Sequence, residues 1–206
     1  MHVGLHKTGT SFCREEIYKK LIGDVQVSEY PLKIKKDFDG LTILDNPFFS
    51  GDSFTVNPCL RYEYLDKMVE WFPDASIVIG LRGFDDWCNS LWREYLTGVH
   101  IGRQPFREFM VWKDEVFDPK GLTAAENMLY VRRLQELFPR VHVCWYETLR
   151  DDPTKFVSDI CRFIGVDVPP WQNNRYKVSM PDESVYKLQN KKFRGKERPP
   201  KDKLFG

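Results

Sequence analysis

The stretch from Ala75 to Leu81 constrains the fold more than any other part of the chain. Its centre, Ile77-Val78-Ile79, contains no polar residue, and a strand without polar alternation is typical of a sheet covered on both faces. Such a sheet needs helices on each side. The sequence supplies them, because short apolar runs alternate with longer stretches in which apolar residues recur every four positions.

These patterns predict an alternation of strands and helices along most of the chain. Strands are expected at residues 2–5, 41–44, 75–81 and 141–145, and helices at residues 11–22, 60–72, 85–96, 123–138 and 152–165. This order indicates a parallel sheet with helices on its faces. We therefore expect a three-layer α/β fold with a central parallel sheet of four to five strands flanked by helices.

The length of 206 residues fits a single domain over residues 1–206. The α/β pattern occupies residues 1–168, and residues 169–206 form a basic C-terminal segment. Eight Lys and Arg residues face only two acidic residues between Lys187 and Lys203. The alternatives for this segment are a solvated tail and a flap over a ligand.

Bulk composition excludes several classes of protein. A net charge of +1 argues against binding to nucleic acid by electrostatics alone. No apolar run approaches the ~18 residues of a membrane-spanning helix, and no secretory signal is visible. The five cysteines form no CxxC pair and lie mostly in apolar stretches, as expected of reduced core thiols in a cytoplasmic protein.

The segment from Gly4 to Ser11 lies between an expected strand and an expected helix. In that position backbone N–H groups and the helix dipole bind anions. Lys7 adds a positive charge, and Gly9 lets the backbone approach a ligand closely. The ordinary nucleotide P-loop has lysine directly after its second glycine, but this chain has Thr10 there, which argues against an ordinary ATPase or kinase.

A second anion-binding pattern follows the buried strand. Arg82 stands at its carboxyl end, which faces the ligand crevice of an open α/β sheet. The planar guanidinium suits a phosphate group, and Ser90 follows eight residues later. The alternative is an Arg82 that pairs with Asp85 or Asp86, with Ser90 exposed.

Three segments together resemble the sulfotransferases that use 3′-phosphoadenosine 5′-phosphosulfate (PAPS). Lys7-Thr8-Gly9-Thr10-Ser11 matches their K-[TA]-G-T-[TS] loop for the 5′-phosphosulfate. Residues 82–91 resemble their 3′-phosphate motif, and residues 143–153 resemble a strand followed by "YEDL…DP". The resemblance covers residues 2–165. It implies a P-loop-like fold, PAPS as donor, PAP as product, no metal, and a 3′-phosphate held by Arg82 and Ser90.

The resemblance also suggests catalytic residues. Lys7 would stabilise the oxygen that leaves with PAP, and Asp45 after the second strand would serve as general base. Several carbohydrate-type members have Glu-Lys-[ST] here, so Asp45 and Asn46 depart from the pattern. Asp52 is an alternative base, and Asp45-Asn46-Pro47 is also a typical turn former.

The basic C-terminal segment has a counterpart in the loop with which these enzymes close the nucleotide site. Lys191, Arg194 and Gly195 are its candidate donor-binding residues. The resemblance leaves the acceptor open, and a small molecule or carbohydrate is favoured, placed near Asp45 and Phe48-Phe49. No nucleic acid or membrane partner is expected.

Two other functions remain open from the residues. Residues 41–45 also resemble a Walker B strand, which would suit a Mg²⁺-dependent P-loop phosphotransferase. The departure at Asp45 and Asn46 also allows a non-catalytic member that only binds nucleotide.

Overall fold

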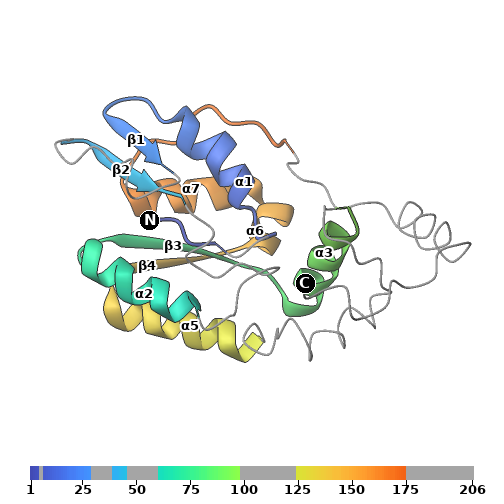
Figure 1. The fold of residues 1–206 in the computed structure, drawn as a ribbon. Coiled ribbons are helices and arrows are strands. Elements are labelled where there is room, and N and C mark those ends of the chain that lie inside the picture. The colour runs from blue at the N-terminus through green and yellow to red at the C-terminus, as the bar shows by residue number, and fades with distance from the viewer. Residues whose placement is uncertain (5–6, 29–38, 46–59, 98–123, 175–206) are drawn as a thin grey trace, which may run out of the picture.

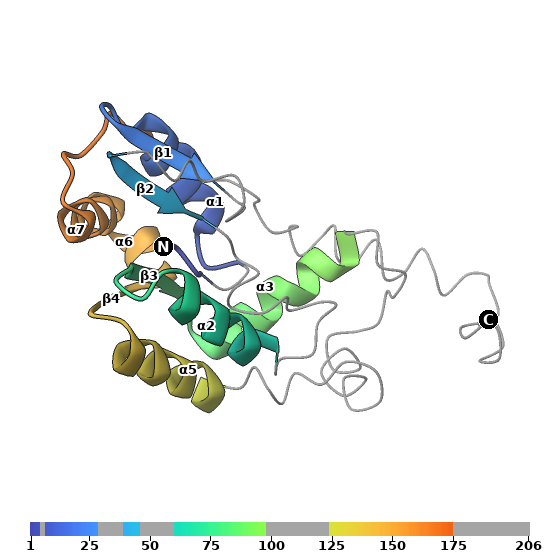
Figure 2. The same cartoon turned by 60° about the vertical axis from the view of Figure 1, so that its left-hand side comes forward.

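The structure, a computed structural model, describes residues 1–4, 7–28, 39–45, 60–97 and 124–174. Its strands in these ranges are β1 (Val25–Ser28), β2 (Leu41–Leu44), β3 (Ser76–Leu81) and β4 (Arg140–Trp145). Its helices are α2 (Leu60–Trp71), α3 (Phe84–Thr97), α5 (Ala124–Leu137), α6 (Tyr146–Asp151) and α7 (Pro153–Ile164). Helices α2 and α5 lie on one side of β3 and β4, and α7 lies on the other (Figure 1; Figure 2).

A further helical run follows the glycine-rich loop and changes its winding twice. It begins as α1 (Thr10–Phe12), becomes a π-helical turn, η1 (Cys13–Ile17), and ends as a 3₁₀ turn, η2 (Tyr18–Lys20). The periodicity of the sequence predicted one helix over residues 11–22. The predicted helical start is present, but residues 21 and 22 lie outside the run.

The strands pair in parallel, as the sequence predicted. Strand β1 pairs with β2, and β3 pairs with β4. Between them, His2 bridges both Asp45 and Val78 in parallel register, and its N–H donates to the Leu44 carbonyl at 2.8 Å. Residues 1–4 therefore lie between β2 and β3. The hydrogen bonding gives two two-stranded sheets joined by these bridges, so the predicted count of four to five strands in one sheet is not confirmed.

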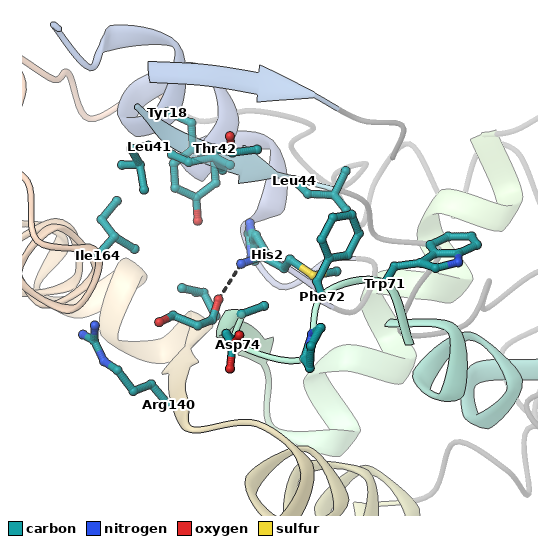
Figure 3. A pocket seen from close by; sticks show the side chains of 16 residues that line it. His2, Tyr18, Leu41, Thr42, Leu44, Trp71, Phe72, Asp74, Arg140 and Ile164 are labelled. Atoms are coloured by element: carbon teal, nitrogen blue, oxygen red, sulfur yellow. Dashed lines mark hydrogen bonds between the residues drawn. The ribbon is translucent and has the colours of Figure 1, made fainter. Parts of the chain in front are cut away.

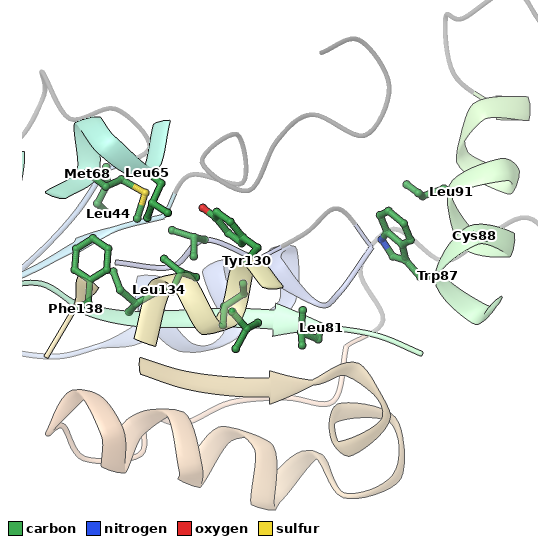
Figure 4. Packing of buried hydrophobic residues seen from close by; sticks show 14 residues of the cluster. Leu44, Leu65, Met68, Leu81, Trp87, Cys88, Leu91, Tyr130, Leu134 and Phe138 are labelled. Carbon is green, nitrogen blue, oxygen red and sulfur yellow. The ribbon is translucent and has the colours of Figure 1, made fainter. Parts of the chain in front are cut away.

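Strand β3 is covered on both faces, as its apolar sequence predicted. Ile77 and Ile79 are fully buried in one core cluster, with α2 and α5. Figure 4 shows this cluster, in which Met68 and Leu134 pack from the two helices. Val78 points the other way into the second cluster, with the helical run after the loop and α7. Cys13, Cys144 and Cys161 belong to that second cluster and are buried free thiols.

A buried arginine joins α2 to α5. Arg61 is fully buried, and its guanidinium donates to a carboxylate oxygen of Glu126 at 3.0 Å and to the Glu126 backbone carbonyl at 2.9 Å. The same guanidinium lies 5.1 Å from the ring centre of Tyr130. A buried charge is tolerated only when it is paired and hydrogen-bonded, and these contacts meet that requirement.

The boundaries of α7 follow local rules that the sequence made visible. The Asp152 carboxylate accepts a hydrogen bond from the Lys155 N–H at 2.9 Å, Pro153 begins the helix, and Gly165 ends it with φ 77°. Left-handed backbone at a helix end favours glycine. No described helix is long and apolar enough to span a bilayer.

The segment after α7 returns to the helical run that follows the loop. The Trp171 and Phe12 rings pack edge to face, with their ring centres 6.1 Å apart. The Gln172 N–H and the Asn174 side chain each donate to the buried Glu16 carboxylate at 2.8 Å. The start of the basic C-terminal segment is thereby fixed against this helical run, while residues 175–206 lie outside the described part.

A candidate anion-binding site at the carboxyl ends of the strands

The loop that the sequence singled out has two residues with left-handed backbone. Lys7 has φ 65° and Gly9 has φ 95°. Left-handed residues in a tight loop let backbone N–H groups converge on an anion. The Cys13 N–H then donates to the Gly9 carbonyl at 3.0 Å and starts the helical run. A Cβ on Gly9 would lie 2.8 Å from the Leu149 side chain, so this position also lacks room for one.

Thr8 places the loop directly against β3. Its side chain is 1% exposed. A Cβ on Gly80 of β3 would lie 2.7 Å from the Thr8 hydroxyl oxygen and 3.3 Å from the Thr8 carbonyl oxygen. Sequence reasoning did not single out Gly80, although a glycine within a buried strand often marks a close backbone approach.

Arg82 reaches this loop from the carboxyl end of β3. One terminal nitrogen of its guanidinium donates to the Lys7 carbonyl at 3.3 Å, and the guanidinium carbon lies 4.2 Å from the ring centre of Tyr146. Among the described residues, Arg82 forms no ion pair with Asp85 or Asp86. Its Nε is buried and has no hydrogen-bond partner there, so it can accept an anionic oxygen as partner.

Helix α3 presents one face to the same loop. Glu94 lies 3.7 Å from the Lys7 ammonium. Ser90 is one turn earlier on the same face of the helix and is only 3% exposed, unlike the exposed serine of the alternative interpretation. The structure therefore brings the loop, Arg82 and the face of α3 that carries Ser90 to one edge of the strands.

Glu147 supports the turn between β3 and α3. Its carboxylate accepts a hydrogen bond from the Gly83 N–H at 2.9 Å. Because Gly83 directly follows Arg82, this contact fixes the direction in which the arginine leaves the strand. Glu147 belongs to the segment 143–153 that resembles "YEDL…DP", and its contact with Gly83 is a structural one.

The Asp45 carboxylate is buried and paired rather than exposed to an acceptor. It lies at the end of β2 and is 1% exposed. The Arg14 Nε donates to one carboxylate oxygen at 2.5 Å, and the His2 Nδ1 lies 3.2 Å from the other. Burial by itself raises the pKa of Asp45, but His2 and Arg14 together hold it below the ordinary value. A doubly paired carboxylate of low pKa is a poor proton acceptor.

Several predicted site residues cannot be placed. Lys191, Arg194 and Gly195 lie outside the described residues, as do Asp52 and the aromatic pair at 48–49. Two contacts that sequence reasoning missed come from Tyr146 and Glu94. Tyr146 directly follows β4, so the rule that placed Arg82 could have found it, whereas no sequence signal marks Glu94.

The described residues contain no group of three or more His, Cys, Asp or Glu side chains arranged to hold a metal ion. The expectation of a reaction without metal stays a prediction.

Comparison with solved structures identifies the fold. A sulfotransferase from Alicyclobacillus acidocaldarius superposes with a TM-score of 0.61 at 20% identity, over 92% of this chain and 90% of that one. Mouse sulfotransferase SULT7A1 complexed with PAP gives a TM-score of 0.56 at 17% identity, over 92% of this chain and 61% of the mouse chain. The sequence matches no family model and no curated protein. The chain thus has a sulfotransferase-like α/β fold.

Proposed function

We propose that this protein transfers a sulfuryl group from PAPS to an acceptor hydroxyl or amine and releases PAP. The observation that carries the proposal is the contact between Arg82 and the Lys7 carbonyl. It joins two segments, 75 residues apart in sequence, that were each expected to bind one phosphate of the same nucleotide. The fold shared with a PAP-bound sulfotransferase supports the same donor.

In this proposal the loop from Lys7 to Ser11 holds the 5′-phosphosulfate, and Arg82 and Ser90 hold the 3′-phosphate. The unpartnered Nε of Arg82 fits this role, because a buried donor without a partner gains a charge-assisted hydrogen bond when an anion arrives. Lys191, Arg194 and Gly195 remain candidates for additional donor contacts.

The chemistry requires one bond to form and one to break. The acceptor oxygen attacks sulfur while the bond between sulfur and the phosphate oxygen breaks, and PAP leaves with that electron pair. Lys7 and the loop N–H groups stabilise the charge that develops on the leaving oxygen. Lys7 lies beside Glu94 in this structure, so donor binding replaces or supplements that partner.

The acceptor proton needs a base. Asp45 was the sequence-based candidate, but its contacts with His2 and Arg14 suit a structural role. We propose that Asp45 fixes the loop by joining residues on both sides of it. Glu94 is then a better candidate base among the described residues, and Asp52 stays open. The acceptor is proposed to be a small molecule or carbohydrate, and the location cytoplasmic.

The rival function, a Mg²⁺-dependent phosphotransferase, needs Asp45 as a metal-holding carboxylate. The Arg14 guanidinium and the His2 ring already lie against that carboxylate, which disfavours a divalent ion at the same oxygens. A non-catalytic protein that only binds the nucleotide would have the same donor site. Only a measurement of turnover distinguishes it from an enzyme.

Binding of PAP to purified protein tests the donor. At about 100 times Kd, a ligand that binds only the folded state stabilises it by ~2.7 kcal/mol, or roughly 5–10 °C in Tm for a chain of this size. Arg82→Ala should abolish the shift. Arg133→Ala removes an exposed arginine of α5 and should leave the shift unchanged.

Turnover is measured with radiolabelled PAPS and a panel of acceptors. Lys7→Ala should greatly lower the rate of sulfuryl transfer while changing the Tm only slightly. Stabilisation by ATP with Mg²⁺ but not by PAP would favour the phosphotransferase. Binding of PAP without transfer to any acceptor would favour the non-catalytic alternative.

A further inference from the structure

Helix α6 contacts both of the segments that are proposed to hold the donor. On the loop, a Cβ added to Gly9 would lie 2.8 Å from the Leu149 side chain and 4.0 Å from the Tyr146 ring. After β3, the Arg82 guanidinium lies over the same Tyr146 ring. One helix of six residues therefore packs against the loop and against the arginine, which are far apart in the sequence.

A cavity of about 760 Å³ lies elsewhere, at the amino ends of the strands. Its lining includes Leu41, Ser76 and Arg140, the first residues of β2, β3 and β4 (Figure 3). Among the described residues, no member of the loop or of α6 lines this cavity, and neither does Arg82. Contacts at the carboxyl ends of the strands therefore hold the donor segments in place, and the walls of this cavity do not.

The pairing between β3 and β4 continues beyond the strands into α6. The last residues of the two strands pair with each other. The next residues along each segment, Tyr146 and Arg82, also meet, through the ring and the guanidinium. One step further, the Glu147 carboxylate accepts a hydrogen bond from the Gly83 N–H at 2.9 Å. Tyr146 and Arg82 are thus held opposite each other by the contacts before and after them.

Two contacts hold the Arg82 guanidinium itself. One terminal nitrogen donates to the Lys7 carbonyl at 3.3 Å, which is long for a hydrogen bond of this kind. The guanidinium carbon lies 4.2 Å from the centre of the Tyr146 ring, well within the ~6 Å over which an aromatic ring attracts a cation. The ring therefore contributes more than the carbonyl to the placement of the guanidinium.

The ring contact leaves the arginine able to bind an anion. The attraction acts between the positive charge and the face of the ring, so it needs no hydrogen-bond acceptor. The Arg82 Nε is buried and has no partner among the described residues. A mobile arginine would lose side-chain entropy on binding an anion, whereas an arginine already held by a ring loses less, and such preorganisation raises affinity.

We propose that Tyr146 is a positioning residue for the donor, whose ring fixes the Arg82 guanidinium for the 3′-phosphate of PAP. This role rests on the proposed function, because it assumes that Arg82 binds that phosphate. A tyrosine that acts only through Arg82 affects the 3′-phosphate and leaves the adenosine and the 5′-phosphate unchanged. That selectivity separates positioning from a direct contact with the nucleotide and from a general loss of stability.

The first test compares PAP with adenosine 5′-monophosphate (AMP), which lacks the 3′-phosphate. Tyr146→Leu removes the ring but keeps an apolar side chain beside Gly9. It should weaken PAP, measured by calorimetric titration, at least about tenfold, equivalent to ~1.4 kcal/mol and within the range of cation–π contacts. The affinity for AMP, measured by saturation-transfer NMR because binding is weak, should equal that of wild type.

Conservative and control variants identify the ring as the cause. Tyr146→Phe keeps the aromatic face and should bind PAP within about twofold of wild type. Tyr64→Leu removes another half-buried tyrosine whose ring lies near a cation, Lys67 of α2, and should leave PAP binding unchanged. Circular dichroism checks that each variant folds, and Tyr146→Met provides a second apolar substitution to be measured in the same way.

A double-mutant cycle tests whether Tyr146 acts through Arg82. Arg82→Lys keeps the positive charge but loses the planar group that stacks on a ring. In that background, Tyr146→Leu should weaken PAP by less than about threefold, because the ring then has no guanidinium to hold. A loss as large as in the wild-type background would show that the ring acts independently of Arg82, and would overturn the proposal.

Three other results would also overturn it. Tyr146→Leu and Tyr146→Met could bind PAP like wild type, or Tyr146→Phe could lose as much affinity as Tyr146→Leu. PAP and AMP could also weaken equally, which would place the ring against the adenosine or the 5′-phosphate. Wild-type protein that binds PAP no more tightly than AMP would instead refute the donor assignment, and with it the role of Tyr146.

Discussion

Asp45→Asn distinguishes a structural carboxylate from a catalytic base. The substitution keeps the shape of the side chain but removes its charge from between Arg14 and His2. Breaking a fully buried ion pair costs about 3–5 kcal/mol. Arg14 is 23% exposed, so its guanidinium is partly rehydrated, and asparagine still accepts a hydrogen bond. We therefore expect a loss of roughly 2 kcal/mol in the free energy of unfolding.

Urea denaturation followed by tryptophan fluorescence measures this loss. Asp39→Asn, at an exposed carboxylate just before β2, is the matched control and should change stability by less than ~0.5 kcal/mol. A double-mutant cycle with Arg14→Met should show that the two effects are coupled.

The pH dependence gives a second readout. The folded-state pKa of Asp45 lies below its ordinary value. Its stabilising contribution is therefore present above the unfolded-state pKa and is lost as the pH falls through the folded-state pKa. Asp45→Asn should remove that part of the acid transition. Unchanged stability together with abolished turnover would refute the structural role and restore Asp45 as the base.

Two further predictions concern the loop and the amino end of the chain. Gly80→Ala should destabilise the fold by about 1–3 kcal/mol and weaken PAP binding in a thermal-shift titration, because the new Cβ would lie 2.7 Å from the Thr8 hydroxyl. In Gly83→Ala the new Cβ would lie 3.3 Å from a carboxylate oxygen of Glu147, at the end of that side chain. This substitution should therefore destabilise the fold less than Gly80→Ala does. Burial lowers the pKa of the Met1 amino group from 8.0 to about 6, against the opposing effect of Asp45, so the unfolded chain binds more protons between these values. The free energy of unfolding should then rise from pH 6 to pH 8 by at most roughly 2.7 kcal/mol. Acetylation of the N-terminus should remove this rise. A rise that survives acetylation would come from other groups, such as His142.

Local rules predicted those parts of the fold that depend on neighbours in sequence. The helix expected at residues 152–165 is present, and the Asp152 cap, Pro153 and Gly165 that bound it all act within a few residues. The two-sided burial of β3 followed from its apolar run. The adjacency of Arg82 and the loop followed from one topological rule, that parallel strands end at the same edge.

Contacts between distant residues could not be predicted from one sequence. The surroundings of Asp45 depend on Arg14 and His2, which are 31 and 43 positions away, and no local pattern announces either contact. The π-helical turn at Cys13–Ile17 was also missed, because its apolar spacing matches that of an ordinary helix. The sequence analysis also predicts no helix at α6, because those residues belong to the segment that resembles "YEDL…DP".

The common direction of the strands separates the molecule into two ends with unlike chemistry. A strand of six residues, such as β3, spans about 20 Å, and at that distance exposed charges are largely screened in physiological salt. Substitutions at Ser76 and at Arg82 should therefore add independently. Selection can accordingly reshape one end of the molecule while the other keeps its chemistry.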